Sequence, residues 1–357
     1  MNNTMVSSEI NVQKVEDFLG RVITDFGGAL GVSLAFIGDQ LGLYKAMAYA
    51  GPLTSEEVAD RTGTSERYVR EWLINQAAGG YIEYDAKARK YMLPDEHAVA
   101  LTEEESPYYV AGGFQIINGL IKAEDRIKSN FLKGGGMKWG EHHHDLFDGT
   151  ERFFKPSYLG NLLNSWLPAI NGMVNKLESG IAVADLGCGH GVSTILMAEA
   201  FPKSHFFGFD NHEPSIKKAR THGKEKKLKN VTFQVSGAAD FNSQQFDFIT
   251  FFDCLHDMGD PVGVLKHCKK MLRKDGVIMA VEPMAGRKTE ENFNPVGRVY
   301  SAASVLCCTP NALATGGYAL GTVAADEELE KVVKNGGFKH FKRVTETPFN
   351  RVFEIKE

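Results

Sequence analysis

The stretch VADLGCGHGVST, residues 183–194, decides the fold of the C-terminal half of the chain. An apolar run leads into Asp185, a glycine-rich loop follows, and a helix is expected to begin near Val192. The loop contains three alternating glycines, Gly187, Gly189 and Gly191. Glycine lets the main chain approach a ligand where any side chain would collide. The pattern predicts a buried strand, a ligand-binding loop and a helix in direct succession.

A second acid follows the next apolar run. Residues 205–209 have the pattern of a strand and lead into Asp210, which lies 23 positions after Gly187. A carboxylate at that place can accept hydrogen bonds from both hydroxyls of a ribose. Because a loop that binds an anion gains little from a nearby acid, Asp185 favours a ligand that carries an ammonium group. Asp185 and Asp210 together predict a site for a positively charged nucleoside.

A nicotinamide dinucleotide enzyme is the alternative for this loop, since it also needs glycines and a ribose-binding acid. Its loop reads G-x-G-x-x-G and leaves the amino terminus of the helix to a pyrophosphate. Here the glycines follow G-x-G-x-G, and an acid precedes the first of them by two residues. The spacing favours another nucleoside cofactor, and an NAD-dependent oxidoreductase is the weaker alternative.

Short apolar runs alternate with helical patterns along the rest of this half. The strands are expected at 181–186, 205–209, 231–235, 246–251 and 277–281. The helices are expected at about 192–201, 213–228 and 261–273. Repeated strand–helix units produce a mainly parallel sheet that is covered on both faces. Residues 338–345 and 349–355 form a hairpin-like pair about Pro348, so we expect the sheet to finish with an antiparallel strand.

The loop and Asp210 resemble the first motif and the ribose-binding acid of the class I S-adenosylmethionine (SAM)-dependent methyltransferases. The resemblance covers residues 180–357. It implies an α/β, Rossmann-like, seven-stranded and mostly parallel sheet that holds SAM at the carboxyl ends of its strands. Many members have Gly-Asp after the third strand, where the acid holds the adenine, but this chain has glycine followed by Ala238. Asp240 is the candidate to replace that contact, and Ala238 and Asp240 are assigned to the cofactor site.

The fourth strand runs into FDFITFFDCLHDMGDP, residues 246–261, where titratable side chains crowd together. They are Asp253, His256, Asp257 and Asp260. In an open parallel sheet this strand end borders the ligand crevice, so Asp253 is assigned to the cofactor site. A histidine beside acids at such a place is a candidate base, and a histidine that only packs under the loop is the alternative.

The segment LHDMGD resembles the catalytic-histidine segment of plant and bacterial small-molecule O-methyltransferases. That resemblance implies that His256 is the general base and that Glu282, in VIMAVEP, is the acid that holds the imidazole. It also implies a small, apolar or aromatic acceptor with a hydroxyl group. Nitrogen and sulfur acceptors stay open, because an amine or a thiol needs little help from a base.

The first hundred residues have the element order of a winged helix-turn-helix. Helical spacing at 12–26 and 34–50 precedes a capped helix from Thr54 and a second one from Ser65. Two short strands, at about 81–84 and 90–93, complete the wing. The O-methyltransferases named above carry such a domain for dimerisation. The resemblance to bacterial stand-alone winged-helix methyltransferases spans nearly the full chain and includes residues 294–317.

A SAM-sensing regulator that binds DNA through the winged helix is the alternative of a different class. DNA-binding domains concentrate positive charge on the recognition helix, because phosphate contacts dominate their affinity. Here Arg67 and Arg70 stand beside Glu66 and Glu71, and the whole chain has a formal net charge of −5. We therefore expect a small-molecule substrate, no nucleic acid, and a homodimer.

Three domains are expected: 1–100 for dimerisation and substrate gating, 101–178 as a helical linker and pocket lid, and 179–357 for SAM binding. An insertion at 287–325 is expected to fold over the pocket. The middle segment is rich in aromatic residues and carries three adjacent histidines, His142, His143 and His144. Ligands of one metal ion must converge, whereas consecutive side chains of an extended loop point apart, so no metal site is expected.

Composition indicates a cytoplasmic protein that binds no membrane. The first residues show no signal peptide, and apolar runs such as 181–186 are shorter than the roughly 20 residues that span a bilayer. The five cysteines have neither metal-ligand spacing nor the spacing of a disulfide framework. The adjacent pair Cys307–Cys308 is expected to be buried and inert.

Overall fold

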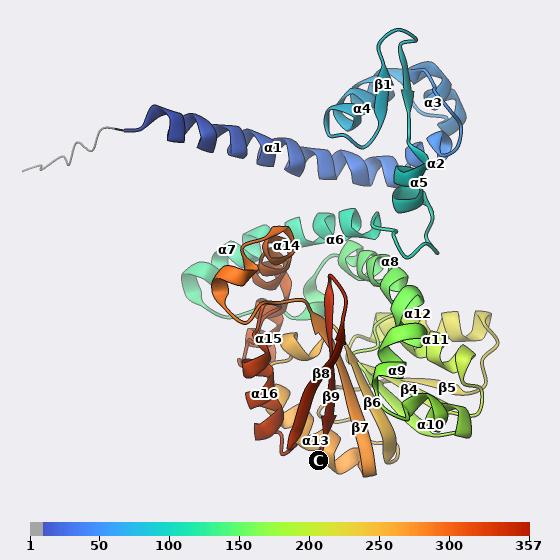
Figure 1. Cartoon of the computed structure of the whole chain (residues 1–357), viewed down its shortest axis with the longest axis vertical. Helices are drawn as coiled ribbons and strands as arrows, with labels where there is room; N and C mark the ends of the chain where they lie inside the picture. The colour runs from blue at the N-terminus through green and yellow to red at the C-terminus, as the bar shows by residue number, and fades with distance from the viewer. Residues whose placement is uncertain (1–9) are drawn as a thin grey trace, which may run out of the picture. The chain divides into compact units, whose positions relative to one another are not determined.

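The computed structural model describes residues 10–357, which divide into two compact units (Figure 1). The first ends at Phe114, and the second runs from Gln115 to Glu357. The elements of the first unit are α1 (Val12–Gln40), α2 (Leu43–Met47), α3 (Ser55–Thr62), α4 (Glu66–Ala78), β1 (Glu83–Asp85), β2 (Lys90–Met92) and α5 (Asp95–Thr102). The order of α3, α4 and the antiparallel β1–β2 pair is that of a winged helix-turn-helix.

Local sequence explains how α3 begins and ends. The Thr54 hydroxyl accepts a hydrogen bond from the Glu57 N–H, and the Glu57 carboxylate accepts one from the Thr54 N–H at 2.7 Å. This reciprocal pair is a capping box. Gly63 adopts a left-handed conformation (φ 65°) after the last turn and ends the helix. The hydrophobic core of this unit is formed around Tyr44 and Trp72, whose rings lie 5.0 Å apart.

The helix α1 is longer than the sequence predicts. Two helices with a break at about 27–33 are expected, but 29 residues form one helix through Gly27, Gly28 and Gly31. Glycine weakens a helix interior by about 1 kcal/mol without ending it. Farther along, Gly38 allows a close approach, since a Cβ there would lie 2.5 Å from the Trp72 ring.

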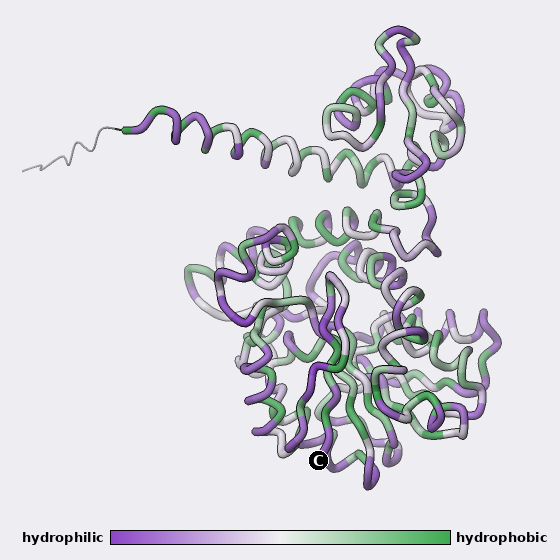
Figure 2. Tube along the Cα trace, viewed as in Figure 1, coloured by the Kyte–Doolittle hydropathy of each residue, from purple (hydrophilic) through white to green (hydrophobic). Residues whose placement is uncertain are grey.

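Large apolar side chains of α1 are exposed. Figure 2 shows that hydrophobic positions recur along this helix. An 18-residue window is apolar enough to cross a membrane, and 11% of it is buried. The core helix of a soluble protein and a signal sequence share this length and composition, so these properties alone do not place α1 in a membrane. The expectation that no apolar run is long enough to span a bilayer is wrong for α1.

A seven-stranded sheet forms the centre of the second unit. Its strands are β3 (Ala182–Leu186), β4 (His205–Asp210), β5 (Val231–Val235), β6 (Phe246–Phe252), β7 (Leu272–Pro283), β8 (His340–Glu346) and β9 (Asn350–Lys356). Their order is β5-β4-β3-β6-β7-β9-β8, and only β9 runs antiparallel to its neighbours. The mainly parallel sheet with one antiparallel strand is confirmed. That strand lies inside the sheet, between β7 and β8.

Helices cover both faces of this sheet (Figure 1). The helical elements from Gly112 onward are α6 (Gly112–Ile121), α7 (Glu124–Lys133), η1 (Trp139–Glu141), α8 (His144–Asn161), η2 (Leu162–Trp166), α9 (Leu167–Ala169), α10 (Met173–Ser179), α11 (Val192–Ala200), α12 (Glu213–Glu225), η3 (Leu255–Asp257), α13 (Pro261–Met271), η4 (Thr289–Asn292), α14 (Pro295–Ala303), η5 (Ser304–Cys308), α15 (Thr309–Thr315) and α16 (Asp326–Asn335). One hydrophobic cluster packs α13 and α16 on the sheet, and a second packs η2, α10 and α11 on its other face.

Candidate active site

A cavity of about 330 Å³ lies at the carboxyl ends of β3, β4 and β6. The chain passes from β5 on one side of β3 to β6 on the other, and a ligand crevice is expected where the strand order changes direction in this way. Side chains of α8 form another wall, among them Phe154 and Tyr158. Asn311 and Thr315, from the 287–325 insertion, also border the cavity.

Two of the three loop glycines line the cavity. Gly187 and Gly189 have left-handed conformations, with φ of 72° and 52°. A Cβ on Gly187 would lie 2.8 Å from the Cys254 thiol, so the close approach requires glycine there. Gly191 is not part of this lining; a Cβ on it would lie 2.7 Å from the Phe233 ring. The lack of a side chain at Gly191 leaves room for the Phe233 ring behind the loop.

Asp185 lies below the loop and outside the cavity lining. One carboxylate oxygen accepts hydrogen bonds from the Ser193 and Thr194 hydroxyls at 2.7 and 2.6 Å, and the other accepts one from Thr250 at 3.1 Å. Burial raises the pKa of this carboxyl to about 6, although the hydroxyls act against the rise. The predicted direct contact between Asp185 and a ligand is not supported by this geometry. The residue ties the loop to α11 and β6.

Asp210 lines the cavity with a carboxylate that the main chain orients. It accepts hydrogen bonds from the N–H groups of Gly189 at 2.9 Å and His212 at 2.8 Å. Burial raises the pKa of this carboxyl, and the two N–H donors oppose the rise. Ala238 and Asp240, the candidates beside the adenine, border the same cavity. The structure therefore brings the ribose and adenine candidates together.

His256 and Glu282 form a buried pair at the ends of β6 and β7. The imidazole Nδ1 lies 2.7 Å from a Glu282 carboxylate oxygen, and the other oxygen accepts a hydrogen bond from the Leu255 N–H at 3.0 Å. Burial lowers the pKa of His256, but the Glu282 carboxylate outweighs it and raises this pKa well above its usual value. The Cys308 thiol also interacts with the imidazole. His256 is 3% exposed and lies just behind the cavity lining.

Asp253 borders the cavity from an uncommon backbone conformation, with φ of 52°. Its Oδ1 accepts a hydrogen bond from the Asn350 amide at 2.8 Å. Its Oδ2 is buried and has no hydrogen-bond partner among residues 10–357. Burial and the nearby Glu282 carboxylate raise the pKa of Asp253 well above its usual value.

Glu151 and Asn350 belong to the site but carry no sequence signal that identified them. Glu151 lines the cavity from α8 and contacts His190 at 2.8 Å and Lys218 at 2.7 Å. Burial opposes ionisation, but these two partners prevail and lower the pKa of Glu151 to about 2. Asn350 comes from β9, 97 positions from the Asp253 that it holds. Only the folded sheet brings such distant positions together.

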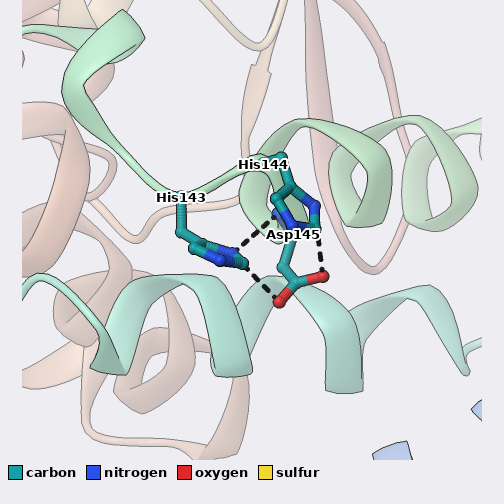
Figure 3. Close-up of side chains that lie close together, drawn as sticks. All are labelled: His143, His144 and Asp145. Carbon is teal, nitrogen blue, oxygen red and sulfur yellow. Dashed lines mark hydrogen bonds and ion pairs between the residues drawn. The ribbon is translucent and has the colours of Figure 1, made fainter.

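The backbone of the histidine run is extended at His142 and His143, and α8 begins at His144. Two of the rings converge with an acid (Figure 3). His143 precedes the first turn of α8 and accepts a hydrogen bond from the Asp145 N–H at 3.3 Å. The ligand atoms of His143, His144 and Asp145 lie within 4.8 Å of one another. The expectation that these side chains point apart is therefore wrong for two histidines. The Lys122 ammonium lies 2.8 Å from the Asp145 carboxylate, which disfavours a second cation.

The two arginines of the expected recognition helix α4 are paired with acids of the same helix. On α4, Arg67 pairs with Glu71, and Arg70 pairs with Glu66 at 2.8 Å. Positive charge that is matched in this way offers little attraction to phosphates.

Comparisons with known proteins agree with this architecture. Residues 177–337 match a family model described as a methyltransferase domain, and residues 28–103 match that of the Rv2258c-like winged HTH domain. The ubiquinone biosynthesis O-methyltransferase of Actinobacillus pleuropneumoniae serotype 7 is 32% identical over 132 residues, which are 35% of this chain and 54% of that protein. The enzyme of the same name from Aromatoleum aromaticum is 28% identical over 40% of this chain and 58% of that protein. The chain thus spans about half the length of the curated relatives it matches.

Solved structures resemble the chain over nearly its whole length. The mitomycin 7-O-methyltransferase MmcR has a TM-score of 0.73 at 14% identity, covering 97% of this chain and 100% of that one. Human N-acetylserotonin methyltransferase, in complex with SAM, has a TM-score of 0.70 at 17% identity and covers 99% of both chains. At such identities the likeness shows the fold. This chain therefore joins a methyltransferase domain of the class I fold, matched over residues 177–337, to a winged helix-turn-helix domain, matched over residues 28–103.

Proposed function

We propose that this protein is a SAM-dependent O-methyltransferase that acts on a small molecule. The observation that carries the proposal is the cavity in which the glycine loop and the Asp210 carboxylate face the same space, with the His256–Glu282 pair directly behind it. Names of the relatives and structural neighbours, which are O-methyltransferases, support the same activity.

The residues around the cavity fit SAM. Gly187 and Gly189 line the cavity with main chain alone, and Asp210 presents an acceptor for ribose hydroxyls. Asp240 is assigned to the adenine. When bound, SAM supplies an electrophilic methyl group. The protein must place the acceptor atom in line with it, at about 3 Å.

His256 is proposed to take the proton of an acceptor hydroxyl. Because the Nδ1 side of the ring faces Glu282, the Nε2 side is left to accept a proton. The Cys308 thiol also interacts with this imidazole. Aromatic side chains of α8 and the residues of the 287–325 insertion would enclose an apolar or aromatic acceptor.

Calorimetric titration of the full chain with SAM and with NAD tests the proposal. We expect SAM to bind and NAD to bind far more weakly, because the loop reads G-x-G-x-G and lacks the G-x-G-x-x-G spacing that places a pyrophosphate at the start of the helix. Tight and preferential binding of NAD would overturn the proposed activity. Incubation with methyl-labelled SAM and a panel of aromatic hydroxyl compounds then identifies an acceptor.

The pH dependence of turnover should report the ionisation of the His256 imidazole. A base must be unprotonated, so turnover should rise with pH as the imidazole, whose pKa is raised, loses its proton. In Glu282→Gln the carboxylate that raises this pKa is gone, and the midpoint should move to lower pH. The maximal rate should also fall, because an amide N–H facing Nδ1 favours the wrong tautomer. An unchanged profile would contradict the role of the pair.

The exposed row on α1 is proposed to pair with a second copy of the chain. Leu19, Ile23, Phe26 and Leu30 are all more than half exposed and follow one another at four, three and four positions, the spacing of helix-to-helix packing. Each buried side chain of this kind contributes about 1.5–3 kcal/mol.

Light scattering on the double variant Ile23→Asp, Leu30→Asp should therefore show half the mass of the wild type. Arg21→Asp, on the opposite side of α1, is the matched control and should stay dimeric. A monomeric wild type, or a double variant that still dimerises, would contradict the pairing.

A further inference from the structure

Asp253 differs from Glu282 and Asp326 because no ion pair is found for it among residues 10–357. Glu282 contacts His256 at 2.7 Å, and Asp326 contacts Arg351 at 2.8 Å. One carboxylate oxygen of Asp253 accepts a hydrogen bond from the neutral amide of Asn350. The other oxygen has no hydrogen-bond partner among residues 10–357. A buried acceptor without a partner is costly, so a group that completes its surroundings would be stabilised there.

Asp253 lies in the wall of the cavity, and its unpartnered Oδ2 is buried behind the surface of that wall. The residue ends β6 in the left-handed region, and its N–H is fixed by a hydrogen bond of 2.8 Å to the Val281 carbonyl. Backbone strain of this kind is retained where the surrounding structure enforces it, often at functional sites. Asp253 borders the same cavity as the glycine loop, so its carboxylate, once ionised, acts on a ligand there across a low-dielectric wall.

We propose that Asp253 makes this site selective for a cationic methyl donor over the neutral product that remains after transfer. The inference rests on the proposed function and concerns its cofactor. SAM carries a sulfonium charge, and S-adenosylhomocysteine (SAH), which lacks the transferred methyl group, does not. A carboxylate that has no ion-pair partner within the protein stabilises SAM, which is positively charged at sulfur, more than SAH. The site would therefore release its product readily.

Binding measurements with Asp253→Asn test this selectivity. The variant keeps the size of the side chain and an acceptor for Asn350, and asparagine tolerates a left-handed backbone, so we expect it to fold. We expect its affinity for SAM to fall by about tenfold or more, the size expected for a close charge pair. The affinity for SAH should change little. Sinefungin, which carries an amine near the position of the methyl group, should follow SAM.

Asp210→Asn is the matched control. The ribose is common to SAM, SAH and sinefungin, so this variant should weaken all three to a similar extent. An equal loss of SAM and SAH affinity in Asp253→Asn would place the α-ammonium group, which both ligands carry, beside Asp253, and would overturn the inference. If the wild type binds neither SAM nor SAH, the proposed function itself fails.

Proton release gives a second readout that does not depend on the folding of Asp253→Asn. A cation in the cavity favours the ionised carboxylate, so SAM binding should release protons in the range where Asp253 is protonated, and SAH binding should not. The titratable groups that face Asp253 are Glu282, His256, Tyr158 and Tyr300. Calorimetry in two buffers of different ionisation enthalpy measures the release. It should persist in His256→Gln, and its disappearance there would assign it to the imidazole and overturn the inference.

Discussion

Replacing His256 by alanine is expected to lower turnover by about 10²–10⁴-fold, the usual contribution of a general base, with SAM affinity nearly unchanged. The imidazole is the group that Glu282 orients, and it lies behind the cavity lining, so its loss should affect proton transfer more than cofactor binding. Single-turnover assays with a hydroxyl acceptor measure the rate, and calorimetry measures the affinity.

His205→Ala is the control, because this histidine is exposed at the first position of β4, at the opposite end of the strand from Asp210. It should leave both quantities unchanged. If His256→Ala binds SAM normally and methylates a hydroxyl at the wild-type rate, the residue has only a packing role. If the protein methylates only amine or thiol acceptors, and His256→Ala lowers that rate only slightly, the protein belongs to that class of methyltransferase.

Replacing Gly191 by alanine is expected to destabilise the methyltransferase domain strongly. The new Cβ would lie 2.7 Å from the Phe233 ring and 3.0 Å from the Ala219 Cβ, at a φ of 82°. Left-handed backbone strain and overpacking each cost about 1–3 kcal/mol, so we expect a total loss of about 2–6 kcal/mol. Thermal unfolding of Gly191→Ala and of the wild type measures this loss of stability.

Gly189→Ala separates packing from ligand approach. A Cβ on Gly189 meets nothing within 4 Å, so this variant carries the backbone cost alone and should unfold closer to the wild type. Because Gly189 lines the cavity, the same substitution should nevertheless weaken SAM binding. Equal melting temperatures for Gly191→Ala and the wild type would contradict the packing role of Gly191.

The features that the sequence predicts well are those written in neighbouring residues. Alternating apolar runs and the glycine loop predict the parallel sheet, and Asp210 follows directly from its place at a strand end. His256 and Glu282 were paired through a family resemblance, and their roles stay predictions. The cytoplasmic location and the domain roles also stay predictions.

Features that depend on contacts between residues far apart in the sequence could not be predicted from neighbouring residues. A sequence does not say that Asp185 points toward the hydroxyls of α11 and away from the cavity. Nor does it say that Asn350 reaches Asp253 from another strand. The predicted break in α1 is wrong for another reason. Glycines suggest a break, but they are tolerated where other residues sustain the helix.

The inner position of β9 has a consequence for the order in which the protein is built. A chain made from its amino terminus completes the loop of Gly187 long before Asn350 is added. The sheet cannot pair β7 with β9, or fix Asp253, until that late segment arrives. A nascent chain therefore possesses the glycine loop at the floor of the cavity well before it acquires Asn350, which anchors the neighbouring wall at Asp253.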